Sequence, residues 1–317
     1  MSAIASIITV GISPCWDLTC YGGQFQWGEH KVISHQELRP AGKALNISRA
    51  LAWSGEENTA AGLWGKEDYE QLRSYWTELS RYTQRNFTVV PGKTRQNVTL
   101  VDTQLGREMH LRSASDLACP QALKKIAAEL KKMVRSQSIC VFAGALPAEP
   151  YLETVVEIIQ SCHNKGARIV VDTQGQALAA IMAKQELWLI KPNLQELSDL
   201  VGYPVDNHKG SICRAAHSLL DRVEMILVSR GPEGALLVTS ESTWHGYCPA
   251  AKTNALCTVG CGDYLLAGFL KGLLRKQEKN EALRMGLKFA TAKAWNQTEE
   301  MKWSRVQRKI KVEIEHF

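Results

Sequence analysis

The sequence predicts an α/β fold with a mostly parallel central sheet. Short runs with strand-like character alternate with helical stretches, as in βαβ units, where helices join parallel strands. Residues 17–39 and 95–112 break this rhythm, because each shows strand-like alternation around a polar turn without a convincing crossover helix. We expect these two hairpins to form a small separate β-sheet across one side of the main body, as a candidate lid.

The individual elements follow from apolar periodicity, which is about 2 residues in strands and 3.6 in helices. Strands are expected at residues 7–12, 138–142, 168–171, 187–190 and 225–229, and a hairpin at 235–239 and 243–247. Helices are expected at residues 43–54, 151–162, 262–275 and 279–295. Pro192 ends the run before it, because the residue preceding a proline avoids helical geometry.

The composition is that of a globular protein. The chain has 317 residues, of which 45% are hydrophobic and 22% charged, enough for a sizeable core. We expect one domain over residues 1–317, with lid insertions at about 14–40 and 90–113. The opening segment lacks a basic n-region and no apolar run reaches a membrane span, so we expect a cytoplasmic protein without a membrane partner. Nine scattered cysteines without a C-x-x-C pair favour reduced thiols over a zinc site or a disulfide framework.

The formal net charge is +6, and part of it gathers near the end of the chain. Five cations there are interleaved with Val, Ile and Glu, which favours a solvated strand or helix face over a nucleic-acid surface. A mild positive balance also suits a small anionic substrate. The five cations are Lys302, Arg305, Arg308, Lys309 and Lys311.

The most informative stretch is Thr-Val-Gly-Cys-Gly-Asp at residues 258–263, followed by an apolar run with helical character. Gly260 and Gly262 allow backbone N–H groups to converge, and a helix start adds unpaired N–H groups and partial positive charge. Together they form a cradle for an anion, with Asp263 at its rim as a base for an incoming hydroxyl. Taken alone, the stretch is more typical of an ordinary glycine turn and a capped helix than of a catalytic site.

Two further motifs offer groups for a sugar or a phosphate. In Pro-Ala-Gly-Lys-Ala-Leu-Asn, residues 40–46, a small-residue turn brings Lys43 and Asn46 to a helix start. In Thr-Arg-Gln-Asn, residues 94–97, Arg95 can grip a phosphate with parallel N–H bonds and Asn97 can bond a hydroxyl. Each alone is also typical of an ordinary junction or an exposed strand.

Two more motifs follow strands in the second half. In Lys-Pro-Asn-Leu-Gln-Glu, residues 191–196, Asn193 and Glu196 share a helical face and could hold hydrated Mg²⁺, or cap the helix. Ser-Arg-Gly-Pro-Glu-Gly, residues 229–234, is a tight turn after a strand, at a position where nucleotides bind in α/β folds.

The order of these motifs is more specific than any one of them. Together with Ser-Pro-Cys-Trp-Asp at residues 13–17, the chain resembles the PfkB-type (ribokinase-like) carbohydrate kinases from about residue 6 to residue 295. It looks most like the branch that phosphorylates sugar phosphates, such as the 1-phosphofructokinases and tagatose-6-phosphate kinases. The resemblance implies a three-layer αβα domain with a β-sheet lid, and an enzyme that uses ATP and Mg²⁺ on a sugar phosphate. A homodimer through the lid is a further expectation from relatives.

The resemblance also implies a role for each matching residue. Asp263 would be the catalytic base, in an anion hole formed by the N–H groups of Gly260, Cys261 and Gly262. The sugar would contact Asp17, Gly42, Asn46 and Asn97, and its phosphate would contact Lys43, Arg95 and Lys31. The ATP phosphates and Mg²⁺ would face Lys191, Asn193 and Glu196, and the nucleotide would face Ser229 and Gly231.

Some positions depart from the family pattern. Ala41 and Ala44 replace glycines, at a cost of roughly 1 kcal/mol each if the backbone needs a positive φ. Lys31 replaces an arginine, Cys257 an acid and Cys261 an alanine. These departures leave open a kinase for an unphosphorylated sugar or nucleoside, and a silent regulator that binds nucleotide or sugar phosphate. A nicotinamide-dependent dehydrogenase is disfavoured, because no G-x-G-x-x-G follows the first strand.

Overall fold

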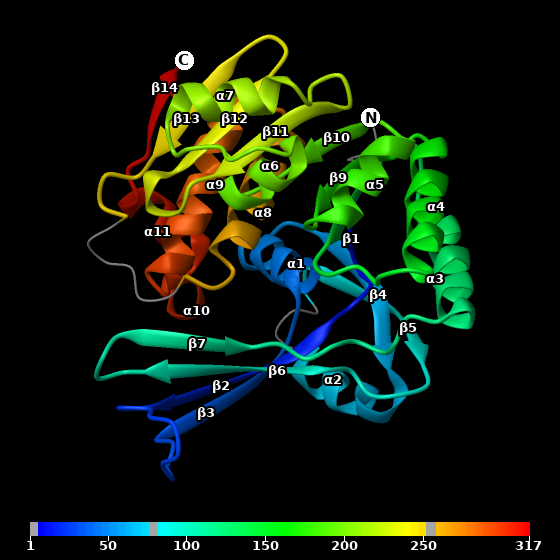
Figure 1. The fold of residues 1–317 in the computed structure, drawn as a ribbon, viewed down its shortest axis with the longest axis vertical. Helices are drawn as coiled ribbons and strands as arrows, with labels where there is room; N and C mark the ends of the chain where they lie inside the picture. The colour runs from blue at the N-terminus through cyan, green and yellow to red at the C-terminus, as the bar shows by residue number, and fades with distance from the viewer. Residues whose placement is uncertain (1–5, 77–80, 252–257) are drawn as a thin grey trace.

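A ten-stranded sheet forms the centre of the molecule (Figure 1). The computed structural model describes residues 6–76, 81–251 and 258–317. Within them the strand order is β14-β13-β12-β11-β10-β9-β8-β1-β4-β5. The strands are β1 (Ile7–Gly11), β4 (Asn58–Gly65), β5 (Thr83–Val90), β8 (Ile139–Ala143), β9 (Arg168–Asp172), β10 (Leu187–Ile190), β11 (Val223–Ser229), β12 (Ala235–Thr239), β13 (Thr243–Tyr247) and β14 (Glu313–His316). Pairing is parallel from β5 to β11 and antiparallel from β11 to β14.

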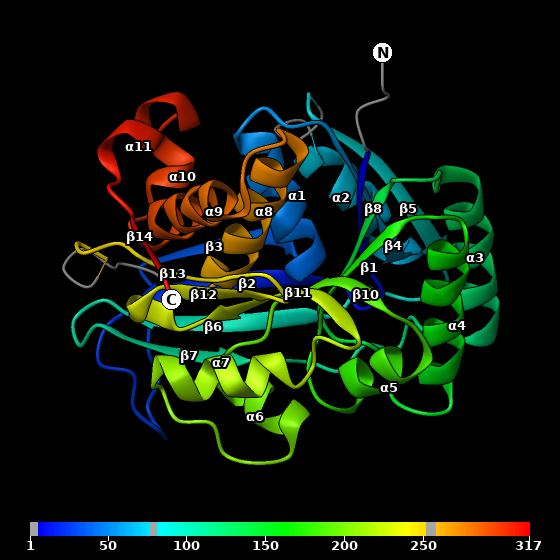
Figure 2. The ribbon, with the colours of Figure 1, turned by 90° about the horizontal axis from the view of Figure 1, so that it is seen from above.

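Helices cover both faces of this sheet and give three layers (Figure 2). Successive strand residues point to opposite faces, so that each face has its own apolar core. One core packs against α3 (Pro120–Met133), α4 (Tyr151–Asn164), α5 (Gln176–Lys184), α6 (Leu194–Val201) and α7 (Lys209–His217). The other packs against α1 (Lys43–Trp53), α8 (Cys261–Leu274), α9 (Lys279–Ala294) and α11 (Trp303–Lys309). Shorter helices are η1 (Lys66–Asp68), α2 (Tyr69–Tyr75), η3 (Gly231–Glu233) and α10 (Gln297–Glu300).

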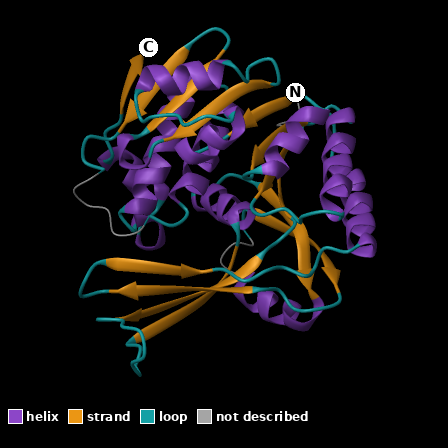
Figure 3. Cartoon of the chain, in the orientation of Figure 1, coloured by secondary structure: helices purple, strands orange, loops and turns teal. Residues whose placement is uncertain are grey.

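The two inserted segments form a second sheet, which lies apart from the main sheet (Figure 3). We call it the lid sheet; its strands are β2 (Cys15–Gly22), β3 (His35–Ala41), β6 (Gln96–Asp102) and β7 (Arg107–Leu111), in the order β3-β2-β6-β7. Each segment is an antiparallel hairpin, and the two join through a parallel β2–β6 pair. The α/β fold with a small β-sheet lid is therefore confirmed.

The predicted elements agree with the structure to within about two residues at each end. The basic C-terminal segment contains both a helix, α11, and a strand, β14, which extends the main sheet through its pairing with β13. Within the described ranges, no helix combines the length and the apolar character needed to cross a membrane.

The parallel strands place several polar residues at one edge of the sheet. Asp172 is the last residue of β9, Lys191 follows β10, and Ser229 is the last residue of β11. The carboxyl ends of parallel strands open at the same edge, where ligands bind in α/β sheets. The starts of α1 and α8 meet this edge, and the candidate site lies there.

Candidate active site

The carboxylate of Asp263 lies in the first turn of α8, buried at 5% exposure. Gly260 caps this helix with a left-handed backbone, φ 80°, which explains the glycine at this position. A Cβ built on Gly262 would lie 3.1 Å from Nζ of Lys191, so a side chain there would crowd the lysine. Cys261 is the first residue of α8, and its N–H points to the Thr258 carbonyl at 3.4 Å.

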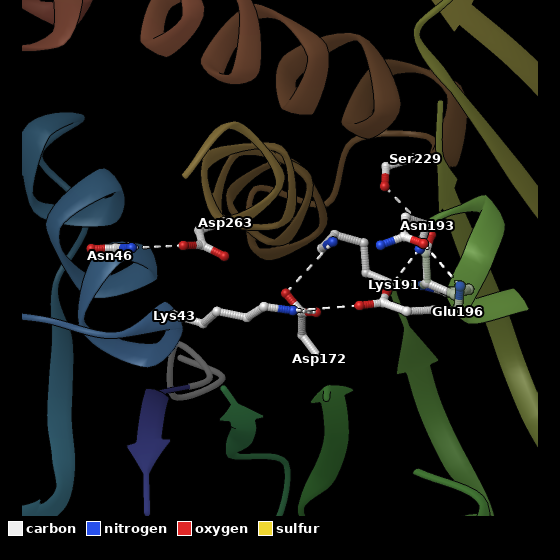
Figure 4. Close-up of polar contacts among 9 residues, drawn as sticks. Lys43, Asn46, Asp172, Lys191, Asn193, Glu196, Ser229 and Asp263 are labelled. Atoms are coloured by element: carbon white, nitrogen blue, oxygen red, sulfur yellow. Dashed lines mark hydrogen bonds and ion pairs between the residues drawn. The ribbon is translucent and has the colours of Figure 1, made fainter. Parts of the chain in front are cut away.

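Asn46 holds the Asp263 carboxylate from the opposite helix. Its Nδ2 donates to Asp263 Oδ2 at 2.8 Å, across 217 positions of sequence (Figure 4). Asn46 lies in the first turn of α1, which begins after Gly42, a residue with a φ of 112°. Two glycine-led helix starts thus bring the predicted amide and the predicted base together.

Asp172 links two lysines at the centre of the site (Figure 4). Lys43 Nζ donates to Asp172 Oδ1 at 2.8 Å, and Lys191 Nζ lies 3.6 Å from Oδ2. The Asp172 side chain is fully buried, Lys191 is 5% exposed, and the Lys43 side chain is 34% exposed. The sequence interpretation missed Asp172 as a site residue. The signal was present, since an acid directly ends a buried strand of a parallel sheet.

The electrostatics of the cluster separate its two aspartates. Burial, together with the nearby Asp172 carboxylate, raises the pKa of Asp263 to about 6. Burial also acts on Asp172, but Lys191 and Lys43 outweigh it and hold the pKa of Asp172 below its ordinary value. Burial opposes the charge of Lys43, and Asp172 outweighs that effect and raises the pKa of Lys43. The Asp172 carboxylate therefore stays ionised, and the Asp263 carboxylate has a pKa close to neutral pH.

Asn193 and Glu196 form the N-terminal cap of α6. Glu196 N donates to Asn193 Oδ1, and Asn193 N donates to Glu196 Oε2, both at 2.9 Å. The capping interpretation is thus confirmed, and it leaves Glu196 Oε1, 4.0 Å from Lys43 Nζ, facing the cluster. Ser229 and Asn193 form an isolated parallel β-bridge beyond the strand ends, in which the N–H of Ser229 donates to the carbonyl of Pro192 at 3.0 Å.

Gly231 begins the turn η3 after β11, with a φ of 56°. A Cβ added to Gly231 would meet nothing within 4 Å, so the space beside its backbone is open. An open, glycine-lined strand end suits a flat ligand such as a nucleotide base.

A cleft of about 370 Å³ separates the lid sheet from α1, α8 and α9. Asp17 of β2 lines it, and Asn97 lies directly opposite Asp17 in the β2–β6 register. Asn97 Nδ2 donates to Asp17 Oδ1 at 3.1 Å. Asn46 and Gly260 line the same cleft from the main body, so Asp17 and Asn46 face one another across it. The fourth predicted sugar-binding residue, Gly42, lies outside this lining, beside Lys43 and Ala44 at the start of α1.

The three cations predicted to hold a substrate phosphate have other partners. Arg95 donates to three backbone carbonyls, those of Pro14, Ser113 and Ser13, at 3.3, 2.7 and 3.0 Å. Lys31 pairs with a neighbouring glutamate at 2.8 Å, and Lys43 is bonded to Asp172. Their role in phosphate binding stays a prediction that these contacts do not support.

The alanines at two family glycine positions carry no backbone strain. Ala41 ends strand β3 and Ala44 lies in α1, and neither has a positive φ. The expected cost of replacing glycine therefore does not arise. Ala44 packs in the core, where its Cβ would lie 3.3 Å from a Cβ on Gly11. Cys257 lies outside the described residues.

Known proteins are similar to this chain over nearly its whole length. Residues 5–296 match the family described as pfkB family carbohydrate kinase. The 1-phosphofructokinase of Haemophilus influenzae is 28% identical over 292 residues, covering 91% of this chain and 90% of that protein. The tagatose-6-phosphate kinase of Staphylococcus epidermidis is 26% identical over 293 residues, covering 92% and 93%.

Solved structures agree with the fold. Phosphofructokinase-2 from Escherichia coli in complex with potassium superposes with a TM-score of 0.88 at 25% identity, covering 96% of this chain and 98% of that one. The same enzyme in complex with fructose-6-phosphate has a TM-score of 0.85 at 23% identity, covering 96% and 100%. With the family match extending over the residues that build the site, the chain belongs to the pfkB family of carbohydrate kinases.

Proposed function

We propose that this protein transfers the γ-phosphoryl group of ATP to a hydroxyl of a sugar phosphate of the fructose 1-phosphate, fructose 6-phosphate or tagatose 6-phosphate type. One observation carries the proposal: a buried carboxylate with a pKa near 6, at a helix start between a cationic cluster and a cleft. The similarity to 1-phosphofructokinase and tagatose-6-phosphate kinase supports the choice of a phosphorylated acceptor.

Asp263 accepts the proton of the attacking hydroxyl in this mechanism. Asn46 fixes one oxygen of its carboxylate, which leaves the other free to face the acceptor. The N–H groups of the cap residue Gly260 and of Cys261 and Gly262 in the first turn of α8 stabilise the developing negative charge, and the Cys261 N–H gives up its 3.4 Å contact with the Thr258 carbonyl to do so. Phosphoryl transfer needs mainly positioning and charge stabilisation, and these groups supply the base and the anion hole.

The cationic cluster faces the ATP phosphates. Lys191 is held beside Gly262 and Lys43 by Asp172, so two positive charges border the anion hole. Ser229 and Gly231 line the position of the nucleotide at the next strand end.

The acidic groups of the cluster fit a magnesium ion carried with ATP. Asp172 Oδ2 is buried, with Lys191 Nζ 3.6 Å away as its ion-pair partner and no hydrogen bond at normal distance, and Glu196 Oε1 is outside the capping interaction. Mg²⁺ keeps most of its waters and needs one or two carboxylates beside the phosphates, so Glu196 and Asp172 would hold it through water, with Asn193 as the neighbouring amide. When bound, the ion neutralises phosphate charge.

The acceptor binds in the cleft under the lid sheet. Asp17 from the lid and Asn46 from the body line the cleft and contact its hydroxyls, with Asn97 beside Asp17 and Gly42 at the start of α1 as the neighbouring groups. Closure of the lid sheet over the sugar excludes water and so limits hydrolysis of ATP. A homodimer through this sheet is part of the proposal, with residues 14–40 and 90–113 as the insertions that build it.

ATP consumption over a panel of hexoses and hexose phosphates tests the function. Activity on at least one hexose phosphate, absent in Asp263→Asn, is the expected result. Activity on free sugars alone would support the unphosphorylated-acceptor alternative. ATP binding without turnover on any acceptor would support the silent regulator instead.

The rate should depend on pH through Asp263. Because the reaction needs the ionised carboxylate, kcat/KM should fall about tenfold per pH unit below pH 6 and level off above it. A pH–rate profile from pH 4.5 to 8.5, with stability checked at each pH, measures this directly. An acid limb near pH 4, where an ordinary aspartate titrates, would contradict the raised pKa.

Gly262→Ala should lower activity without lowering the stability of the fold. Its Cβ would crowd Lys191 Nζ at the anion hole, so kcat should fall about tenfold or more. Alanine favours helices over glycine and Gly262 has no positive φ, so the unfolding midpoint should hold or rise. Gly210→Ala in α7 is the matched control, with unchanged kcat expected. An unchanged kcat in Gly262→Ala would contradict the assignment of Gly262 to the anion hole.

A further inference from the structure

Asp68 is a buried acidic residue that the proposed mechanism does not use. It ends the short helix η1, which follows β4, and is 5% exposed. Its Oδ1 accepts the backbone N–H of Thr94 at 2.9 Å, and its Oδ2 accepts the indole N–H of Trp16. No cationic side chain lies within ion-pair distance of Asp68 among the residues that the structure describes. The two N–H groups therefore compensate the carboxylate for the water that it has lost.

The two donors to Asp68 come from the two hairpins of the lid sheet. Trp16 is in β2, and Thr94 lies two positions before the start of β6. Thr94 Oγ1 also accepts the N–H of Gly65, the last residue of β4, at 3.0 Å. Figure 1 shows α2, which follows Asp68, beside the end of the lid sheet where its strands come together. One side chain of the main body thus holds both lid insertions.

The residues held in this way are close in sequence to the predicted acceptor contacts. Trp16 is 2% exposed and packs edge-on against Trp64, with ring centroids 5.5 Å apart. The next residue, Asp17, points to the opposite side of the strand and lines the acceptor cleft. Asn97, which bonds to Asp17, follows Thr94 by three residues. A displacement of either held group would therefore move an acceptor contact.

We propose that Asp68 is a positioning residue, which places Asp17 and Asn97 at the acceptor cleft by fastening both lid hairpins to the main body. This inference rests on the proposed function, in which these two side chains contact or border the hydroxyls of the sugar. Asp68 itself is not part of the cleft lining, so it acts through the lid. A misplacement of about 1 Å is enough to weaken a preorganised site. The groups that face ATP are at other strand ends of the main sheet and do not depend on this link.

The test compares Asp68→Asn and Trp16→Phe with the wild type. Asparagine keeps the shape of the side chain but has a single oxygen for two N–H donors, and phenylalanine keeps an aromatic ring without the donor. For the sugar phosphate that the wild type turns over best, Asp68→Asn should raise the acceptor KM about 10- to 100-fold, and Trp16→Phe about threefold or more. The KM for ATP should be unchanged. Because both substitutions break the same hydrogen bond, the double variant should resemble Asp68→Asn alone.

Glu56→Gln is the matched control for a loss of stability without a loss of positioning. The Glu56 side chain is 14% exposed and pairs with Lys271 and Arg275 at 3.3 and 3.2 Å. Lys271 is in the last turn of α8, at the opposite end of that helix from Asp263. This variant should lower the free energy of unfolding and leave both KM values where they are.

Hydrogen exchange measures the attachment of the lid without reference to activity. Relative to the amides of β1, those of β2 and β6 should exchange faster in Asp68→Asn and Trp16→Phe, and at the wild-type rate in Glu56→Gln. A wild type inactive on every phosphorylated acceptor would refute the proposed function itself, and the exchange rates would still decide whether Asp68 holds the lid. In an active enzyme, an unchanged acceptor KM in both variants, equal rises in the acceptor and ATP KM, or unchanged exchange in β2 and β6 would overturn this inference alone.

Discussion

Asp263→Asn should lower kcat by about 10²- to 10⁴-fold while leaving ATP binding largely intact, because only the proton acceptor is lost. The variant keeps the shape of the side chain and an oxygen that can accept the Asn46 hydrogen bond. Steady-state kinetics and calorimetric titration of ATP measure the two quantities. Asp221→Asn, an exposed surface aspartate paired with Arg222 at 3.8 Å, is the matched control.

The same substitution should stabilise the fold at pH 8. The Asp263 carboxyl has a pKa of about 6 when folded and near 3.8 when unfolded. A raised folded pKa means that stability present at low pH is lost as the pH rises through about 6. Two pKa units correspond to about 3 kcal/mol, so Asp263→Asn should gain about this much stability at pH 8 and little at pH 4, where the buried carboxyl is already protonated. Urea unfolding at both values checks the sign; an unchanged or lower free energy of unfolding at pH 8 would contradict the burial of an ionised Asp263.

Asp172→Asn should cost both stability and activity. It removes the one carboxylate within ion-pair distance of Lys191 among the described residues, and that lysine is 5% exposed. Leaving a buried charge without its partner costs about 3–5 kcal/mol. Because Lys43 and Lys191 lose their common anchor, kcat/KM should also fall about 10²-fold.

A purely structural role for Asp172 can be distinguished from a role in positioning the cluster. The Asp172 carboxylate raises the pKa of Asp263, so its removal should move the acid limb of the pH–rate profile to lower pH. Asp221→Asn should leave both the limb and the unfolding free energy where they are. Wild-type stability and kinetics in Asp172→Asn would show that the two lysines do not depend on this carboxylate.

Sequence patterns predicted the frame of the fold because strand and helix periodicities are local. Even the lid sheet was predictable, since each of its hairpins carries its own turn residues. The motif glycines lie where the backbone takes a positive φ, 80° at Gly260 and 112° at Gly42, and their approach to a ligand stays a prediction. Periodicity, turn residues and motif glycines each depend on residues that are close together in the sequence.

Side-chain partners across long sequence separations were not predictable in this way. Lys43 was expected beside a substrate phosphate, but its long side chain reaches Asp172, 129 positions away. Arg95 was expected beside the same phosphate, but its guanidinium donates to three backbone carbonyls of neighbouring loops. Every residue has a backbone carbonyl, so the sequence does not indicate which carbonyls will be the partners. Asp68 is outside every motif, and only the fold shows that its carboxylate reaches both lid hairpins.

The most direct test of the central claim follows the γ-phosphoryl group itself. Wild type and Asp263→Asn are incubated with γ-labelled ATP and a hexose phosphate, and the label is measured in the sugar bisphosphate and in free phosphate. The wild type should move the label to the sugar in a one-to-one ratio with ADP, and Asp263→Asn should move almost none. Label released only as free phosphate, or equal transfer by both proteins, would contradict Asp263 as the base of a sugar-phosphate kinase.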